Sequence, residues 1–455
     1  MPKKHELKYL VLSDLHLGET DSLFTSREGG QSDLVTCFSK CLADLIKDFD
    51  QEDFPMMVLN GDILGLSFSS YGESLAVFEQ FVAAFTHHHK VCDQVAYLPG
   101  NHDQHIWQLA QEEKFQEALE KRTKNEAFPA LRHTTPSGYA EGFSSRFFQA
   151  FAPEGMKLNL KINYPNLLLP PTRDGGSGIL IHHGHFAEPA YRFFSIAMQA
   201  LYPELKPPSD LEALSEQNGS MIDFVYSELG RSGEAGEYFC TLMATLSSEE
   251  LLEKHIDELA KNLAASVDFP YIPIEVLEEQ LAKTLIQNIA ETVRTERSNE
   301  EEVCSDKTME GVMDYLQNYG LEVLEKQGCP TNKLTFIWGH THKPFEKATS
   351  HAQIDNLRIF NTGGWVIPRK PVETIGASVL LIDQHNEVQA LRIFNDGEDG
   401  GTMHFKVIPI DDTPSTFADS ITEYLYPDGE TLNPVWSSFK NKLQQEIKDR
   451  RKDEA

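Results

Sequence analysis

Five short polar clusters in this chain are rich in residue types that bind metal ions. In chain order they are Asp14-x-His16, Gly61-Asp62, Gly100-Asn101-His102-Asp103, His183-Gly184 and Gly339-His340-x-His342. Each cluster directly follows a short apolar run that has the length and composition of a buried β-strand. Because ligands of open α/β sheets bind outside the carboxyl ends of the strands, we expect the five clusters to converge at one edge.

The residue types in these clusters favour divalent metals. Carboxylate oxygens and neutral imidazole nitrogens bind Mn, Fe and Zn, and none of the clusters contains a cysteine. In Asp14-x-His16 and His340-x-His342, residues two apart in extended backbone would point to the same side. The candidate ligands are Asp14, His16, Asp62, Asn101, His183, His340 and His342. A single tetrahedral zinc takes about four ligands, so this larger set predicts two metals that share a bridging carboxylate.

The five clusters, in this order, resemble the pattern of the calcineurin-like metallophosphoesterase superfamily. The resemblance covers roughly residues 7–186 and 333–383. It implies an α/β fold, specifically a calcineurin-like four-layer β-sandwich flanked by helices. In this chain the sandwich would carry a large α-helical insertion.

The resemblance also implies a role for each candidate residue. The first metal would be held by Asp14, His16 and His342, the second by Asn101, His183 and His340, and Asp62 would bridge them. His102 would lie over the substrate phosphate, where it stabilises charge or protonates the leaving oxygen, and Asp103 would orient His102. The implied reaction is hydrolysis of a phosphate mono- or diester through a metal-bridging hydroxide. We expect two divalent ions, with Mn preferred over Fe or Zn.

Other residues near the clusters have two interpretations each. In the run from His182 to His185 the family pattern selects His183, and strand alternation makes His182 a packed residue. His185 either contacts the substrate or packs. Trp365 either stacks on the substrate or fills the edge of the site, and we favour the second interpretation. Three arginines are candidates for gripping a phosphate, namely Arg27, Arg146 and Arg192.

Three further functions remain open from the sequence. They are a metal-dependent nuclease, a lipid-linked pyrophosphate hydrolase and a catalytically silent binding scaffold. The second is considered because residues 13–18 resemble the opening of enzymes that cleave UDP-diacylglucosamine. The formal net charge of -30 disfavours nucleic acid and leaves a small phosphorylated substrate as the expected partner. The oligomeric state is not determined by the sequence.

The first hundred residues alternate strands with helices. Strands are expected at 9–12, 56–59 and 95–98, and amphipathic helices at 33–49 and 74–88. This alternation predicts a mostly parallel sheet covered on both faces. Further strands are expected at 157–169, 179–181, 334–338, 356–362, 377–382 and 404–408, with a hairpin between 382–383 and 388–389.

The chain divides into three parts by its patterns. Residues 1–186 and 328–410 form the expected metallophosphoesterase core, 187–327 a helical insertion or cap, and 411–455 a C-terminal extension. Helices are expected at 191–201, 211–229, 247–265, 273–295, 308–326 and 434–448. The insertion lies between two core strands and could therefore roof the strand ends. We expect the last eight residues, which carry charges of both signs, to be solvated and without a chemical role.

Cysteine usage and the N-terminus bear on the compartment. The six cysteines form no Cys-x-x-Cys pair, which fits a reducing environment. The start of the sequence does not have the composition of a signal peptide. No apolar run approaches the roughly 20 residues that span a membrane. We therefore expect a cytoplasmic protein with no membrane span.

Overall fold

Two β-sheets form the centre of the protein. The computed structural model describes residues 5–452 except 31, 50, 153–157, 174, 203, 229–301, 369, 398–399 and 412. The seven-stranded sheet has the order β12 (Thr402–Ile408), β11 (Val388–Asn395), β10 (Gly376–Asp383), β1 (Leu7–Leu12), β2 (Met56–Asn60), β3 (Gln94–Leu98) and β4 (Leu160–Ile162). The five-stranded sheet has the order β5 (Asn166–Leu169), β6 (Gly178–His182), β7 (Lys333–Trp338), β9 (Ile354–Asn361) and β8 (Phe345–His351).

The two sheets pack face to face through apolar side chains. This inner cluster takes Val11, Val58 and Leu380 from the larger sheet and Ile181 and Ile337 from the smaller one, and all five are fully buried. Alternate residues of each strand therefore point into the space between the sheets, as the two-residue period of a strand requires.

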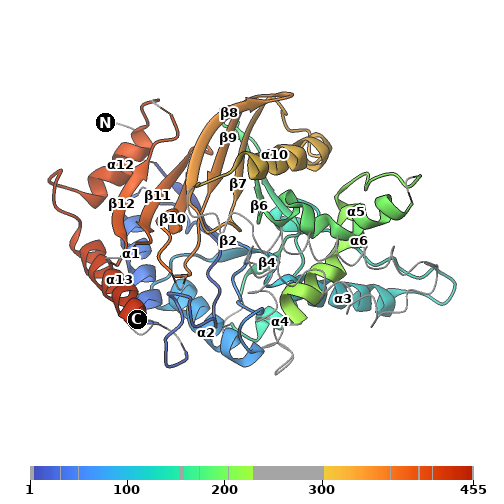
Figure 1. Cartoon of the computed structure of the whole chain (residues 1–455), viewed down its shortest axis with the longest axis horizontal. Helices are drawn as coiled ribbons and strands as arrows, with labels where there is room; N and C mark the ends of the chain where they lie inside the picture. Colours follow the sequence, from blue (N-terminus) through green and yellow to red (C-terminus); the bar gives the residue numbers. More distant parts are fainter. Residues whose placement is uncertain are drawn as a thin grey trace, which may run out of the picture.

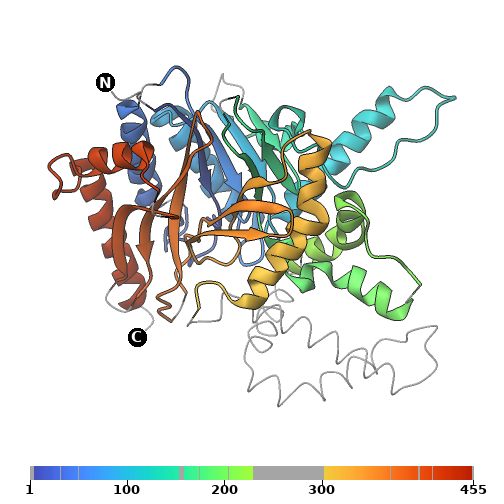
Figure 2. The ribbon, with the colours of Figure 1, turned by 90° about the horizontal axis from the view of Figure 1, so that it is seen from above.

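Helices cover the outer face of each sheet, which gives four layers (Figures 1 and 2). The larger sheet is flanked by α1 (Asp33–Asp48), α2 (Tyr71–Ala83), α12 (Thr416–Leu425) and α13 (Pro434–Lys452). The smaller sheet is flanked by α10 (Asp306–Tyr315) and α11 (Leu321–Lys326), and the ring of Tyr315 lies 6.4 Å from that of Phe336 in β7. The predicted α/β sandwich flanked by helices is confirmed.

The parallel part of the predicted sheet is confirmed in β1, β2, β3 and β4, which pair in parallel. Both faces of this sheet are covered, as predicted, but only one face is covered by helices, because the second sheet packs against the other. The hairpin of β10 and β11 is confirmed, with Ile382 opposite Val388. The single strand expected at 157–169 is instead two short strands, β4 and β5, in different sheets, with a cis Tyr164–Pro165 bond between them.

Local sequence signals explain where the helices of the core begin. Ser32 caps α1 by accepting a hydrogen bond from the amide of Leu34. Ser70 and Glu73 form a reciprocal capping box at the start of α2. The long helix α3 (Gln104–Lys121) follows β3. The remaining short elements are η1 (Ala84–His88), which continues α2, and η2 (Tyr139–Glu141), α4 (Arg146–Gln149) and η3 (His185–Ala187). Strand β8 and helix α3 were not predicted.

The described residues between β6 and β7 form helices joined by loops. It contains η4 (Pro189–Arg192), α5 (Phe193–Leu201), α6 (Leu211–Asp223), η5 (Phe224–Glu228), α10, η6 (Leu316–Gly320) and α11. These helices match the predictions at 191–201, 211–229 and 308–326, whereas those at 247–265 and 273–295 lie outside the described residues. Helices α5, α6 and α3 lie together at the opposite end of the molecule from α12 and α13 (Figures 1 and 2).

The C-terminal helix differs from the prediction. Helix α13 runs to Lys452 and packs along α1. Arg450 is only 7% exposed, and its guanidinium donates hydrogen bonds to the carbonyl oxygens of Thr20 and Thr25. The expectation of a solvated end is therefore wrong at Arg450, because the loop after β1 offers carbonyl acceptors to this side chain.

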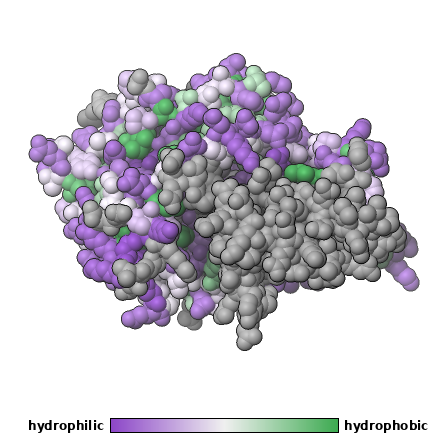
Figure 3. Space-filling view, viewed as in Figure 1, coloured by the Kyte–Doolittle hydropathy of each residue, from purple (hydrophilic) through white to green (hydrophobic). Residues whose placement is uncertain are grey.

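The described surface is mostly hydrophilic on the face seen in Figure 3, in keeping with the acidic composition. Across the described residues, no helix combines the length and apolarity needed to cross a bilayer. The described cysteines, which exclude Cys240, are free thiols.

Candidate metal centre

The carboxyl ends of five strands bring all seven predicted ligands together. Asp14 and His16 follow β1, Asp62 follows β2, Asn101 follows β3, His183 follows β6, and His340 and His342 follow β7. Each of the seven side chains is buried, and the most exposed, His340, shows 7% of its surface. The predicted convergence at one edge is thus what the structure shows.

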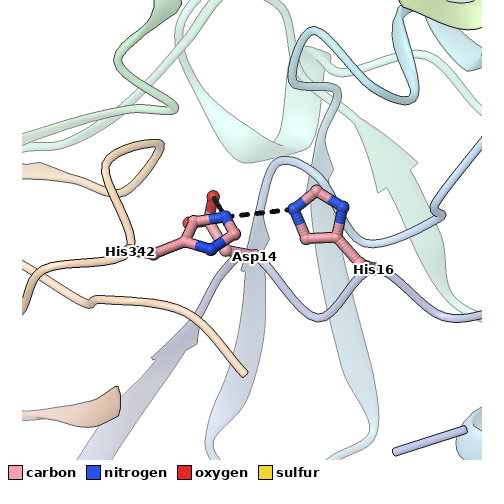
Figure 4. A group of neighbouring side chains, drawn as sticks. All are labelled: Asp14, His16 and His342. Atoms are coloured by element: carbon pink, nitrogen blue, oxygen red, sulfur yellow. Dashed lines mark hydrogen bonds and ion pairs between the residues drawn. The ribbon is translucent and has the colours of Figure 1, made fainter. Parts of the chain in front are cut away.

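The first group consists of Asp14, His16 and His342, whose ligand atoms lie within 4.8 Å of one another (Figure 4). Nε2 of His342 lies 3.3 Å from Oδ1 of Asp14 and 3.2 Å from Nε2 of His16. Two imidazole nitrogens and a carboxylate oxygen thus face the same point. On a tetrahedral cation with bonds of about 2.0–2.2 Å, ligand atoms lie roughly 3.3–3.6 Å apart, so this spacing suits a shared cation.

The second group consists of Asp62, His183 and His340, again within 4.8 Å. Nε2 of His183 lies 3.3 Å from Oδ2 of Asp62 and 3.2 Å from Oδ1 of Asn101. The same Asp62 oxygen is 3.7 Å from Nε2 of His16 in the first group. The carboxylate of Asp62 therefore lies between the two groups, where a bridging ligand would be needed.

The charges of this cluster compensate one another. Burial raises the pKa of Asp14, but the hydrogen bond from His342 and the charge of His183 outweigh it and hold the pKa at about 2. Burial lowers the pKa of His183, but Asp62 outweighs burial and raises that pKa to about 9. The carboxylates thus stay ionised despite their burial, which is the state that binds a cation.

The backbone at the ligands is in an unusual conformation. The φ angles of Asp14, His16 and Asp62 are 52°, 47° and 51°, and those of His340 and His342 are 72° and 60°. The backbone of these residues is therefore left-handed, not extended. The side chains of Asp14-x-His16 and His340-x-His342 do converge, but the alternation of an extended strand, from which their convergence was predicted, is not the cause. Backbone strain of this kind concentrates at functional sites, where surrounding contacts enforce it.

Contacts between the loops enforce that strain. The amides of Asp14 and His16 donate to the carbonyl oxygens of Gly61 and Asp62 at 3.0 and 2.9 Å. The amide of His340 donates to the Asp14 carboxylate at 3.0 Å. At Gly61, whose φ is 84°, a Cβ atom would collide with the ring of His183. Glycine is required at this position because the backbone at the end of β2 approaches the imidazole of His183 so closely.

His102 and Asp103 lie beside the two groups but make different contacts. His102 is 6% exposed, its amide donates to Oδ1 of Asp62 at 2.8 Å, and its Nε2 lies 4.0 Å from Oδ2 of Asp62. The Asp103 carboxylate accepts hydrogen bonds from the Tyr97 hydroxyl and the amides of Gly100 and Ile63. Burial and the charge of Asp62 raise the pKa of Asp103 to about 6. These contacts fix the loops after β2 and β3, and orientation of the His102 ring by Asp103 stays a prediction.

Two carboxylates at the centre were not predicted. Oε1 of Glu19 lies 2.9 Å from Nδ1 of His16 and 3.9 Å from Nδ1 of His102. Oε1 of Glu188 lies 3.3 Å from Nε2 of His340, and neither Glu188 oxygen has a hydrogen-bond partner among the described residues. A signal for Glu19 was its position three residues after His16. No local pattern marks Glu188, because its place depends on how the chain turns after β6.

Three further residues considered in the sequence, His182, His185 and Trp365, are buried in the interior of the protein. His182 is buried against Tyr315, with ring centroids 4.4 Å apart, so its predicted packing is confirmed. His185 is fully buried among aromatic rings, and burial holds its pKa well below the usual value. Trp365 is buried and stacks on Phe24 at 4.6 Å, which supports the structural interpretation.

Two of the three candidate arginines have partners away from the centre. Arg192 forms an ion pair with Asp314 of α10, and Arg27 donates to the carbonyl oxygen of Asp449. Arg146 begins helix α4, where its backbone amide is bound by Glu113.

Comparison with known proteins agrees with this arrangement. Residues 7–226 match the family model described as calcineurin-like phosphoesterase. The match contains the clusters from Asp14 to His183, and the His340 cluster lies beyond it. A search of curated proteins found no match to the chain.

Proposed function

Because residues 7–226 place this chain in the calcineurin-like phosphoesterase family, we propose that it hydrolyses a phosphate mono- or diester with two divalent cations. The observation that carries the proposal is the position of Asp62, whose carboxylate lies between two buried groups of imidazole and carboxylate ligands. A single structural ion pair would not need so many imidazole and carboxylate side chains around one point.

We assign the ligands as follows. One cation would be held by Asp14, His16 and His342, the other by Asn101, His183 and His340, and Asp62 would bind both. Bound divalent cations would polarise the phosphoryl oxygens and make water nucleophilic near neutral pH. Among N/O sites of this type Mn, Fe and Zn are all suitable, and we propose Mn as the metal for activity.

His102 is the proposed proton donor. Its ring is slightly exposed at the edge of the ligand cluster, and its Nε2 approaches Asp62. A protonated imidazole there would donate to the leaving oxygen of the ester.

The segment 187–327 is proposed as a cap on a discontinuous core of residues 1–186 and 328–410. In support, the ring of Tyr226 in η5 lies 6.0 Å from that of His102, and Oγ of Ser67 donates to the carbonyl oxygen of Tyr226. Oγ of Ser227 also lies 3.4 Å from the carbonyl oxygen of His102. Residues of the segment thus border the proposed proton donor and would contact the leaving group of a substrate.

Charge guides the choice of substrate. The net charge of -30 repels a polyanion at long range, whereas a small phosphate ester needs only the local positive charge of the cations. A small phosphorylated molecule is therefore the proposed substrate.

The test is hydrolysis of p-nitrophenyl phosphate and bis-p-nitrophenyl phosphate by the Mn-loaded chain. Asp62→Asn should abolish turnover of both, and His87→Ala, at an exposed helix end, should not change it. Turnover that survives Asp62→Asn would refute the proposal. Cleavage of single-stranded or plasmid DNA at comparable rates would instead favour the nuclease.

A further inference from the structure

A second kind of ligand cluster lies outside the proposed centre, between the core and the helices that follow β6. His105 belongs to the first turn of α3, Asp223 is the last residue of α6, and Glu228 is the last residue of η5. Nδ1 of His105 lies 3.4 Å from Oδ1 of Asp223 and 3.2 Å from Oε1 of Glu228. All three ligand atoms fall within 4.8 Å of one another.

Two of the three facing atoms are buried and make no hydrogen bond with the described residues. Nδ1 of His105 and Oδ1 of Asp223 are both inaccessible to water and have no hydrogen-bond partner among the described residues. Burying such atoms without a partner costs about 1–3 kcal/mol each, so a native structure normally provides one. The side chains as a whole remain accessible, at 20% for His105, 17% for Asp223 and 47% for Glu228, so an ion could enter from solvent.

From this arrangement we propose that His105, Asp223 and Glu228 bind a third divalent cation, of the zinc type. The separations of 3.2 and 3.4 Å match the roughly 3.3–3.6 Å expected between ligands of one tetrahedral zinc. One imidazole and two carboxylates form a ligand set that zinc accepts, and the exposed side leaves a position for water. The cation also offsets the repulsion between two carboxylates brought to one imidazole.

The alternative is a protonated His105 paired with the two carboxylates. An imidazolium Nδ1 has one proton and can donate one good hydrogen bond, yet oxygens of two acids lie 3.2 and 3.4 Å from it. A cation would bind Nδ1 of His105 and Oδ1 of Asp223 at once, and these are the two atoms without a hydrogen-bond partner among the described residues. The geometry therefore favours the cation.

The cation would fasten the cap to the core next to the proposed centre. Its ligands come from α3, which begins one residue after Asp103, and from α6 and η5 of the segment 187–327. Tyr226 and Ser227 precede Glu228 directly, and both lie against His102. Loss of the cation would release the end of η5, so these two residues would lose their fixed position over the proposed proton donor.

The test is the zinc content of the full-length chain after saturation with zinc and removal of excess ion, measured by plasma mass spectrometry. The wild type should hold about three zinc ions, His105→Ala about two, and Asp62→Asn about one. Asp223→Asn should reproduce the loss seen in His105→Ala, and circular dichroism should show both variants folded. His87→Ala should match the wild type.

The outcomes separate this inference from the proposed dinuclear centre. If the wild type and His105→Ala hold equal amounts of zinc, the third site is refuted, whatever Asp62→Asn does. If instead the wild type holds about one ion and His105→Ala none, the third site stands and the dinuclear centre fails. X-ray absorption of Asp62→Asn should show one imidazole and otherwise oxygen ligands, and a shell with several imidazoles would contradict the assignment.

Discussion

The carboxylate of Glu19 lies 2.9 Å from Nδ1 of His16, while the other ring nitrogen of His16 faces Nε2 of His342 at 3.2 Å. A carboxylate on one imidazole nitrogen fixes the proton there and leaves the other nitrogen free of a proton to bind a cation. Glu19 is therefore the residue that sets the tautomer of a proposed ligand, although it belongs to none of the five sequence clusters.

Glu19→Ala should weaken metal binding. Removing a carboxylate that supports a ligating histidine typically costs 10–100-fold in metal affinity, and we expect about that loss for Mn. Competition with a fluorescent chelator measures it. The Mn affinity of Glu19→Gln should lie between those of the wild type and Glu19→Ala, because the amide oxygen of glutamine can still accept a hydrogen bond from His16. The control is Glu28→Ala, at an exposed position of the same loop. Equal affinities for Glu19→Ala and wild type would contradict this role.

Glu188→Ala should make activity depend more strongly on metal concentration. The carboxylate is buried beside His340 and has no described hydrogen-bond partner, so a cation at the second group would be its natural counter-charge. We expect lower activity at limiting Mn and recovery at high Mn. Glu204→Ala, at an exposed position, should behave like the wild type. A loss that added Mn cannot restore would point to a packing role.

His102→Gln should slow the chemical step without changing metal content. General acids contribute roughly 10²–10⁴-fold, and the loss should grow as the leaving group becomes more basic. A series of aryl phosphates with leaving groups of different pKa measures this dependence. If every ester in the series slows by the same factor, His102 is not the proton donor.

Arg450→Ala should destabilise the fold. The buried guanidinium donates to the carbonyl oxygens of Thr20 and Thr25, and hydrogen bonds to a charged group contribute about 1.5–3 kcal/mol to the free energy of unfolding. Urea denaturation measures the change. Lys452→Ala, exposed on the same helix, should cost little. Equal midpoints for the two variants would show that the contact with the loop contributes no stability.

The strand ends were predictable because their signals are local. A short apolar run followed closely by Asp, Asn or His marks a buried strand and a polar edge, and β1, β2, β3, β6 and β7 all end in this way. Helix α3 gave no such signal. Its buried residues lie in its first half, around Ile106, Trp107 and Ala110, so no apolar stripe runs along its length.

Other features could not be read from local patterns because they depend on distant contacts. The left-handed backbone of His340 is held by a hydrogen bond from its amide to the carboxylate of Asp14, a residue that is far away in the sequence. The cluster of His105, Asp223 and Glu228 joins residues more than a hundred positions apart, and His105 alone had no partner in sequence. Burial of Arg450 likewise requires the loop that follows β1.

The contact between the amide of His340 and the Asp14 carboxylate constrains how this protein can be made. A ribosome delivers the chain from its N-terminus, and domains tend to fold as they emerge. Asp14 and His16 leave the ribosome more than three hundred residues before His340 and His342, which complete their group. Nascent chains therefore carry incomplete ligand groups until His340 and His342 have emerged, and the proposed pair of cations can be captured only after that.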